Sequence, residues 1–287
     1  MPETSLRELE RELARLRDAS TEPGDAPSIR ASVMTHIAWV PETWVEQATE
    51  TLAGLAERHP SRTILLFPRP GDPDGLDGEV DLRCFVRGGQ EGEVCSEVIS
   101  LRLGGQRCQA PASIVTPLLV SDLPVFLRWR GQLPFGAPEL EQLVGVADRL
   151  IIDSAEWADA ESTVPRLTEL FDRIAVSDIC WARTEPWRGA IADLWPDVAE
   201  ASTLRVAGTR NEALLLRAWL AARLRRPIDL HHEPAGEIEL VEVDGREARP
   251  FRLERRTPSD LLSDQLELFG RDRVYEESVR NYSPPPT

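Results

Sequence analysis

The sequence predicts an α/β protein built from two mixed-sheet α/β units with flanking N- and C-terminal helices. Three observations carry this prediction. Strand-like and helix-like segments alternate from Ile29 through both halves of the chain. The length of 287 residues suits two domains. A hydrophobic content of 41% with 29% charged residues is typical of a globular protein. The expected organisation is an N-terminal helix and linker (1–28), a first α/β domain (29–158), a second α/β domain (159–250), and a C-terminal helix and tail (251–287).

Four leucines near the start of the chain, Leu6, Leu9, Leu13 and Leu16, follow a three-four-three spacing between alternating Glu and Arg residues. This pattern predicts an amphipathic helix of about four turns. The helix either docks on its own domain or forms a two-helix seam with a partner. The stretch from Ser20 to Ser28, rich in Pro, Gly and Asp, predicts a linker.

The first domain is predicted element by element from hydrophobic period and from turn residues. Its expected elements are a strand over 32–40, a helix opened by Pro41 and ended before Pro60, a buried strand over 63–67, two hairpin strands over 80–86 and 94–103, a proline-punctuated segment over 110–121, a strand over 124–129, a helix over 138–144 and a strand over 149–153.

The second domain repeats the alternation. A helix is expected behind Ser162 and Thr163, with Leu167, Leu170, Phe171 and Ile174 at helical spacing. Further elements are a helix over 186–194, a strand over 203–207, a helix over 211–224, and strands over 228–231 and 238–243. A C-terminal helix begins at Thr257-Pro258 and ends at Gly270, and the tail from Asn281 to Thr287 is expected to be loose.

Composition excludes several classes of function. The chain has 33 basic and 49 acidic residues and a net charge of −16, which argues against nucleic acid and against anionic membranes as partners. All the basic residues are arginine, so chemistry that requires a lysine amine is excluded. No signal peptide or membrane-spanning run is visible, and the four cysteines form no CxxC pair. We therefore expect a cytoplasmic protein.

Motifs for catalysis and cofactor binding are absent from the sequence: there is no GxGxxG, P-loop, GxSxG or HExxH. We expect no enzyme activity, no cofactor and no metal. Neighbouring His231 and His232 point to opposite faces of a strand and cannot readily chelate one ion. His36, in an apolar strand, is expected to be a core histidine. The carboxylates Asp148, Asp153 and Glu156 near a strand end suit either catalysis or capping.

Tryptophan and arginine gather in two places, Trp129-Arg130 and the stretch from Trp181 to Arg188. These residue types dominate protein–protein hot spots, and core tryptophans covered by arginine stems are the equal alternative. The candidate partner-binding residues are Trp129, Arg130, Trp181, Arg183, Trp187 and Arg188. A third interpretation has Arg128, Arg130, Arg183 and Arg188 ringing a pocket for a sugar phosphate.

Cys84 and Cys95 lie on the two predicted hairpin strands. A symmetric loop would place them directly opposite each other and within reach of a disulfide. The alternation of Leu82 and Val86 against Val94 and Val98 favours a register shifted by one, with Ser96 opposite Cys84. We therefore expect two free thiols.

Five segments of the chain are distinctive: His59–Arg62, the run from Ser113 to Gly131, Asp148–Ala155, Trp181–Arg188 and Asp272–Glu277. Together they resemble the OpcA family of glucose-6-phosphate dehydrogenase assembly or activator proteins. The resemblance spans about residues 29 to 280, and the central run is its most specific part.

The resemblance implies a non-catalytic assembly factor or allosteric activator that binds glucose-6-phosphate dehydrogenase in the oxidative pentose phosphate pathway. The alternative function is an enzyme or sensor that acts on a phosphorylated sugar through an arginine-lined pocket. The residues themselves give no direct support to a sugar-phosphate ligand.

Overall fold

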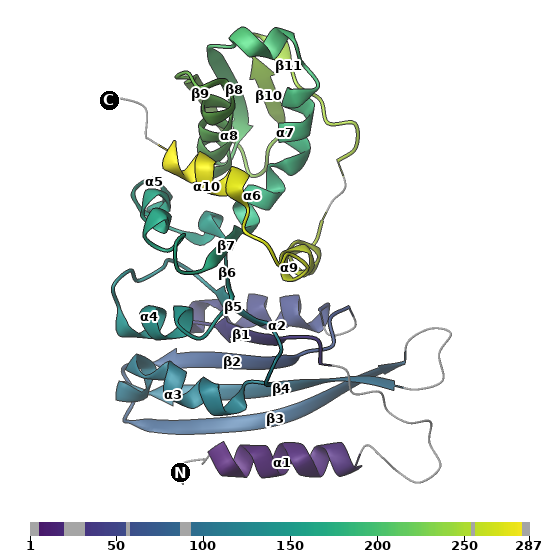
Figure 1. Cartoon of the computed structure of the whole chain (residues 1–287), viewed down its shortest axis with the longest axis vertical. Coiled ribbons are helices and arrows are strands. Elements are labelled where there is room, and N and C mark those ends of the chain that lie inside the picture. Colours follow the sequence, from purple (N-terminus) through teal and green to yellow (C-terminus); the bar gives the residue numbers. More distant parts are fainter. Residues whose placement is uncertain (1–5, 20–31, 56–57, 87–92, 254–255, 283–287) are drawn as a thin grey trace. The chain divides into compact units, whose positions relative to one another are not determined.

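A computed structural model describes residues 6–19, 32–55, 58–86, 93–253 and 256–282 of the chain (Figure 1). The chain forms two compact units. The first comprises residues 1–151 and 258–267, and the second comprises residues 152–257 and 268–287. None of the helices in the described segments is long and apolar enough to cross a membrane.

The first unit is organised around a mixed sheet. Its strands are β1 (Thr35–Trp39), β2 (Arg62–Arg69), β3 (Gly75–Val86), β4 (Glu93–Gly104), β5 (Val125–Trp129) and β6 (Arg149–Ile152). They are ordered β3-β4-β2-β1-β5-β6, and only the pairing of β3 with β4 is antiparallel. The helices are α1 (Leu6–Ala19), α2 (Val45–Ala53), α3 (Pro111–Val115), α4 (Pro138–Val144) and α9 (Pro258–Leu266). The predicted mixed α/β class is confirmed.

The two faces of this sheet differ in composition because side chains alternate along each strand. On one face Ile37, Ile64 and Leu101 are fully buried. On the other face Ala38, Val40 and Leu65 pack with Ala48 of α2. Towards the amino ends of β1, β2 and β4 this second face becomes polar, with His36, Ser61, Thr63 and Ser96.

Helix α1 packs along β3 (Figure 1). Its leucine stripe carries the contact, since Leu9 and Leu13 are only 3% and 2% exposed. The interpretation that this helix docks on its own domain is therefore confirmed. The predicted linker over 20–28 lies outside the described residues.

The β3–β4 hairpin corrects the predicted register. Cys84 lies directly opposite Cys95, and the two form a disulfide. The shifted register would set Asp81 against Ile99 and Glu79 against Leu101, yet Ile99 and Leu101 are fully buried. Only the symmetric register keeps the carboxylates of β3 on the solvent face over the whole strand. The prediction failed because it weighed only four residues near the turn.

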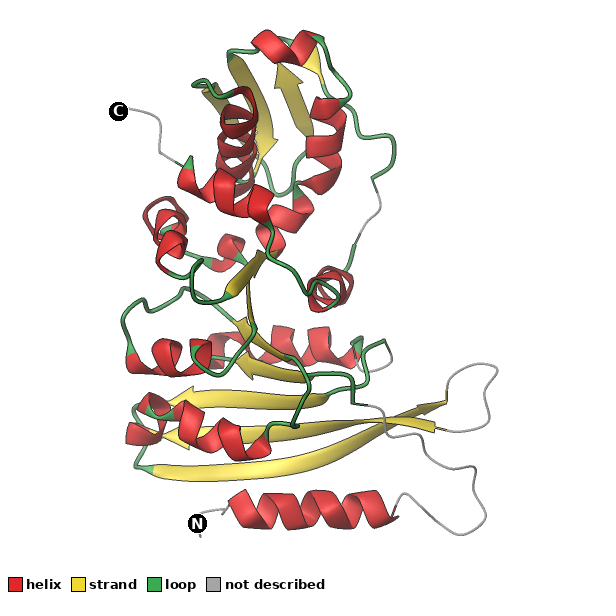
Figure 2. Ribbon diagram, viewed as in Figure 1, coloured by secondary structure: helices red, strands yellow, loops and turns green. Residues whose placement is uncertain are grey.

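The second unit holds a smaller mixed sheet, whose strands are among those drawn in yellow in Figure 2. The strand order of this sheet is β11-β10-β8-β9. The helices and strands of the second unit are α5 (Ala160–Thr163), β7 (Ala175–Asp178), α6 (Ile179–Arg183), α7 (Glu185–Ala192), β8 (Thr203–Gly208), α8 (Arg210–Leu224), β9 (Asp229–Pro234), β10 (Leu240–Val243), β11 (Arg246–Glu247) and α10 (Arg273–Arg280). Of these strands, β7 is not part of the smaller sheet. Helix α8 packs against β8 and β9, which it joins as a crossover between parallel strands.

Two predictions for this unit are wrong. No continuous helix runs to Ile174, because the chain turns into a 3₁₀ helix over Val164–Glu169 at Pro165, which lacks the N–H for a helical bond. The tail is not loose from Asn281 onward, because Tyr282 is 3% exposed. Residues 283–287 of the predicted tail lie outside the described residues.

Candidate functional site

The three tryptophans predicted to bind a partner are each buried within one unit. Trp129 is 2% exposed, Trp181 is 4% exposed and Trp187 is 5% exposed. Their rings therefore form part of the packing. Of the arginines beside them, Arg130 is also buried, whereas Arg188 is half-buried.

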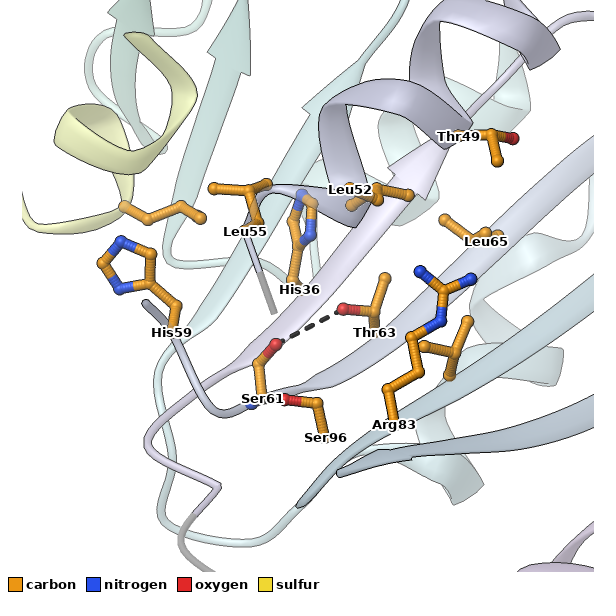
Figure 3. A pocket seen from close by; sticks show the side chains of 12 residues that line it. His36, Thr49, Leu52, Leu55, His59, Ser61, Thr63, Leu65, Arg83 and Ser96 are labelled. Carbon is orange, nitrogen blue, oxygen red and sulfur yellow. Dashed lines mark hydrogen bonds between the residues drawn. The ribbon is translucent and has the colours of Figure 1, made fainter. Parts of the chain in front are cut away.

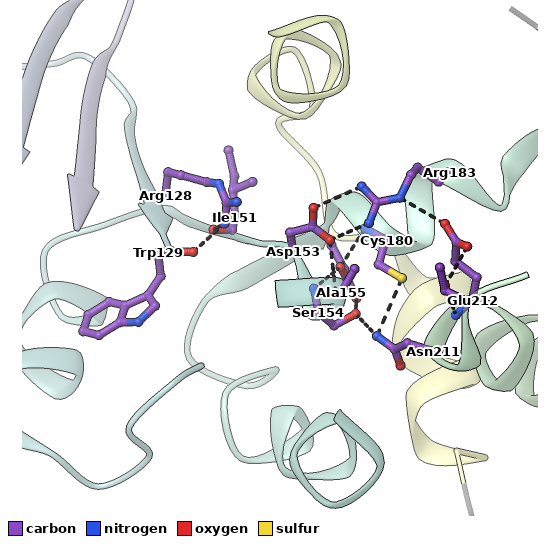
Figure 4. A network of polar contacts seen from close by, with 12 residues as sticks. Arg128, Trp129, Ile151, Asp153, Ser154, Ala155, Cys180, Arg183, Asn211 and Glu212 are labelled. Carbon is purple, nitrogen blue, oxygen red and sulfur yellow. Dashed lines mark hydrogen bonds and ion pairs between the residues drawn. The ribbon is translucent and has the colours of Figure 1, made fainter. Parts of the chain in front are cut away.

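In the first unit, β5 ends at Trp129, whose ring stacks on Trp39 at a centroid distance of 4.9 Å. The guanidinium of the next residue, Arg130, lies 4.7 Å from the ring centroid of Trp44. Arg128 is 2% exposed, and its Nη1 donates to the backbone carbonyl of Trp129 (Figure 4). Arg128, Trp129 and the following Arg130 therefore serve the packing at the carboxyl end of β5.

In the second unit, α6 and α7 position Trp181 and Arg188. The indole Nε1 of Trp181 donates to a carboxylate oxygen of Asp272 at 2.9 Å. The guanidinium of Arg188 stacks 3.5 Å from the centroid of the Trp181 ring, which is cation–π distance. Burial lowers the pKa of Arg188 to about 10, against the opposing effect of Asp272 and Glu185, so the group stays charged at neutral pH.

Arg188 makes no ion pair with any residue in the part of the chain that the structure describes, and its Nε lacks a hydrogen-bond partner. A half-buried guanidinium that is held on an aromatic ring and makes no direct ion pair with the described residues is suited to receive a carboxylate from another molecule.

Arg183, at the end of α6, is held by ion pairs, unlike Arg188 (Figure 4). Its Nη atoms donate to both carboxylate oxygens of Asp153 at 3.0 and 2.8 Å, and its Nε donates to Glu212 at 3.0 Å. Burial acts to lower the pKa of Arg183, but the Asp153 and Glu212 carboxylates outweigh it and raise that pKa. This arginine joins the turn after β6 to the start of α8.

A buried polar network that the sequence did not reveal surrounds Asp178, at the end of β7. The carboxylate of Asp178 accepts hydrogen bonds from the Ser154 hydroxyl at 2.5 Å and from the Tyr275 hydroxyl at 3.0 Å. Asn211 donates to the same Ser154 hydroxyl and accepts from Tyr282. Burial and then the charge of Asp153 raise the pKa of Asp178 to about 6, against the lowering effect of its hydrogen bonds.

One sequence signal could have pointed to this network. Tyr275 and Tyr282 are the chain's two tyrosines, and both lie near the C-terminus. A buried tyrosine needs a partner for its hydroxyl, so Tyr275 in the first turn of α10 and Tyr282 just after its end predict a buried polar contact.

Beside the network, Ser154, Trp157, Arg210 and Asn211 line a pocket of about 470 Å³ at the start of α8. Its arginine is already paired, since the Arg210 Nε donates to Glu161 at 2.8 Å, and its second carboxylate, Asp159, caps α5. Cys180, next to the network, is fully buried, and burial raises the pKa of its thiol, so it offers no thiolate at neutral pH.

The other residues weighed for chemistry have structural partners. Asp148 accepts the backbone N–H of Val125 at 2.8 Å, and Asp153 caps the turn at Ala155 while it pairs with Arg183. His231 is exposed and His232 faces the other side of β9, where it contacts the Gly208 carbonyl at 2.9 Å. Among the described residues no group of three metal-ligating side chains comes together.

Two family models match the chain in succession. The one described as the glucose-6-phosphate dehydrogenase subunit N-terminal domain covers residues 53–169, and the one described as its C-terminal domain covers residues 174–279.

Curated relatives agree with these matches. The chain is 26% identical over 201 residues to an OxPP cycle protein OpcA of Nostoc punctiforme, covering 66% of the chain and 43% of that relative. It is 24% identical over 213 residues to an OxPP cycle protein OpcA of a Synechocystis strain, covering 70% of the chain and 45% of that relative. The chain thus spans less than half the length of these relatives.

Proposed function

The chain belongs to the OpcA family of glucose-6-phosphate dehydrogenase subunits, and from this premise we propose that it binds a glucose-6-phosphate dehydrogenase and promotes its active form. The observation that carries the proposal is the match of both subunit domains, in order, across most of the described chain. The proposed role is that of a non-catalytic assembly factor or allosteric activator, and the proposed location is the cytoplasm.

The physical requirement for such an activator is a difference in affinity. A protein shifts its partner towards the active form only if it binds that form more tightly. A coupling free energy of about 1–3 kcal/mol gives roughly a 5- to 150-fold change in affinity, and the coupling is reciprocal. Glucose 6-phosphate should therefore tighten the complex if the activator acts on substrate affinity.

Within the proposed contact residues, Arg188 has the strongest physical case. Its guanidinium is charged, held on Trp181 and free of any ion pair with the described residues. We assign the buried Trp181 a positioning role, since its ring holds the guanidinium of Arg188. Trp129 and Trp187 are buried, so their contribution to a contact would be indirect, through the packing.

The alternative of a sugar-phosphate pocket receives less support. Its four arginines are divided between the units, with Arg128 and Arg130 in the first and Arg183 and Arg188 in the second. In addition, Arg183 is already held by the two carboxylates of Asp153 and Glu212. Neither unit alone supplies the ring of arginines that this function requires.

Calorimetry tests the binding proposal. The purified chain is titrated into the glucose-6-phosphate dehydrogenase of the same organism, beside the variants Arg188→Ala and Arg166→Ala. We expect Arg188→Ala to cost about 2 kcal/mol of binding, as a hot-spot arginine does. Arg166 is the matched control because its pairing with Glu169 is exposed. Equal binding by wild type and Arg188→Ala would remove Arg188 from the contact, and no heat with any of the three would contradict the proposal itself.

A further inference from the structure

A cavity of about 40 Å³ lies in the first unit at the amino ends of β1, β2 and β4 (Figure 3). Leu52 and Leu55 from the α2 side and Leu266 from α9 cover it. Its polar lining consists of two imidazoles, four hydroxyls and one guanidinium: His36, His59, Thr49, Ser61, Thr63, Ser96 and Arg83. The Thr49 hydroxyl donates to the backbone carbonyl of Val45 within its own helix.

His36 in this lining is an unsatisfied polar group. It is 2% exposed, and its Nε2 has no hydrogen-bond partner among the described residues. Burial, then Arg128 and His59, lower the pKa of His36 to about 4, so the ring is neutral at pH 7 and has one N–H donor and one acceptor nitrogen. A buried donor or acceptor without a partner costs about 1–3 kcal/mol, which favours a bound molecule at this place.

The chemistry of the lining indicates the charge of that molecule. None of the residues lining the cavity is a carboxylate, although the chain has 49 acidic residues. The nearest acidic partners, Asp81 on Arg83 and Glu267 near His59, have side chains that are 63% and 70% exposed and are therefore well solvated. Hydroxyl, imidazole and guanidinium donors around a space without carboxylates favour an anion over a cation.

The volume indicates the size of the ligand. A space of about 40 Å³ holds about three water molecules, whereas pockets for nucleotides and similar ligands measure about 300–1,000 Å³. His36 and Arg128 also line a second cavity of about 10 Å³. This volume is at the lower limit for holding one water molecule.

We propose that the cavity under α2 and α9 binds a small oxyanion of the size of bicarbonate or phosphate, hydrogen-bonded by His36 and by the Ser61–Thr63 hydroxyl pair. The hydrogen bond of 3.3 Å between these two hydroxyls uses one of their two protons and leaves the other for the anion. The Arg83 side chain, on the edge strand β3 and 35% exposed, completes the charge balance at the rim. This site is independent of the dehydrogenase contact proposed above.

Imidazole NMR of the full chain tests the proposal directly. The protein is labelled with ¹⁵N-histidine, its four histidines are assigned with His36→Gln, and it is titrated with sodium phosphate and, separately, with sodium bicarbonate at constant ionic strength. We expect the ring nitrogens of His36 to shift and saturate with one or both anions, while those of His231 and His232 do not. Shifts that stay linear, or that sodium chloride reproduces, would mean that only water fills the cavity and would overturn the proposal.

Two variants and a control locate the anion. Thr63→Val keeps the side-chain volume but removes a hydroxyl, and we expect it to weaken the anion affinity by about fivefold, the worth of one hydrogen bond. Arg83→Gln, on the partly exposed edge strand, should weaken it similarly and covers the case that Thr63→Val does not fold. Thr168→Val, in the second unit, is the control and should bind as wild type does. Unchanged affinity in both cavity variants would contradict the site.

Discussion

Arg183 shows how a single side chain can bind together segments that are far apart in the sequence. It pairs with Asp153, which is 13% exposed, and with Glu212, which is 4% exposed. Arg183→Ala would leave these two carboxylates close together without compensation, so we expect the free energy of unfolding to fall by about 3 kcal/mol. Arg166→Ala, which breaks an exposed pair, should change it by about 0.5 kcal/mol. Urea unfolding measures both, and equal losses would contradict the assignment.

Asp178 makes the stability of the chain depend on pH in a defined direction. Burial, then Asp153, raise its pKa from 3.8 to about 6, so the folded state holds this proton more tightly than the unfolded state. The stability that Asp178 contributes is therefore present below about pH 4 and is lost as the pH rises through 6. Asp178→Asn cannot ionise. We expect it to gain stability relative to wild type between about pH 4 and about pH 7 in urea unfolding. Parallel curves for the two proteins would refute this prediction.

In the β3–β4 hairpin the observed strand register differs from the register predicted from the sequence. The disulfide between Cys84 and Cys95 leaves Cys108 and Cys180 as the free cysteines, both buried. We expect thiol titration of the denatured, unreduced protein to find two thiols rather than four. Replacing both hairpin cysteines with serine should lower the free energy of unfolding by about 2 kcal/mol, because the unfolded chain is no longer constrained. Four titratable thiols would contradict the pairing.

Helix α1 offers a test of its docking on β3. Leu13 is 2% exposed, so Leu13→Ala removes buried methyl groups and should lower the free energy of unfolding by about 3 kcal/mol. Arg15, whose side chain is 75% exposed, is the matched control on the same helix, and Arg15→Ala should be nearly neutral. If Leu13→Ala behaves like the control, the helix does not depend on this contact.

Elements with a strong hydrophobic period could be predicted from sequence. The structure confirms the predicted strands at β1, β2, β5, β6, β8, β9 and β10 and the predicted helices at α1, α2, α4, α7, α8 and α9. Short elements such as β7 and α6 were missed, because four or five residues carry too little periodicity to distinguish them from a loop. Helix α10 was missed because the residues from Arg273 to Arg280 are mostly polar and its position depends on the buried contacts of Tyr275.

The candidate site was predictable as residue types but not as roles. Sequence alone selected Trp181 and Arg188, and the structure adds that the ring of one carries the guanidinium of the other. The sequence could not reveal the network of Asp178, Ser154 and Asn211, since this network joins segments that meet only after folding. Burial, which depends on the tertiary fold, decides which of these groups are structural.

For the whole molecule, the central claim is that the chain is a non-catalytic subunit acting on a partner enzyme. Family membership supports it across both domains. The chain alone is then expected to turn over neither glucose 6-phosphate nor its lactone. A steady turnover that disappears in Arg183→Ala or in a variant of Asp153 would contradict this expectation.

The most direct measurement is NADPH production by a fixed amount of the purified glucose-6-phosphate dehydrogenase, titrated with the chain while light scattering follows the size of the complex. We expect the rate at low glucose 6-phosphate to rise and saturate in step with the formation of a larger species. A rate that stays constant up to a tenfold excess of the chain, without any growth in particle size, would contradict the proposed function.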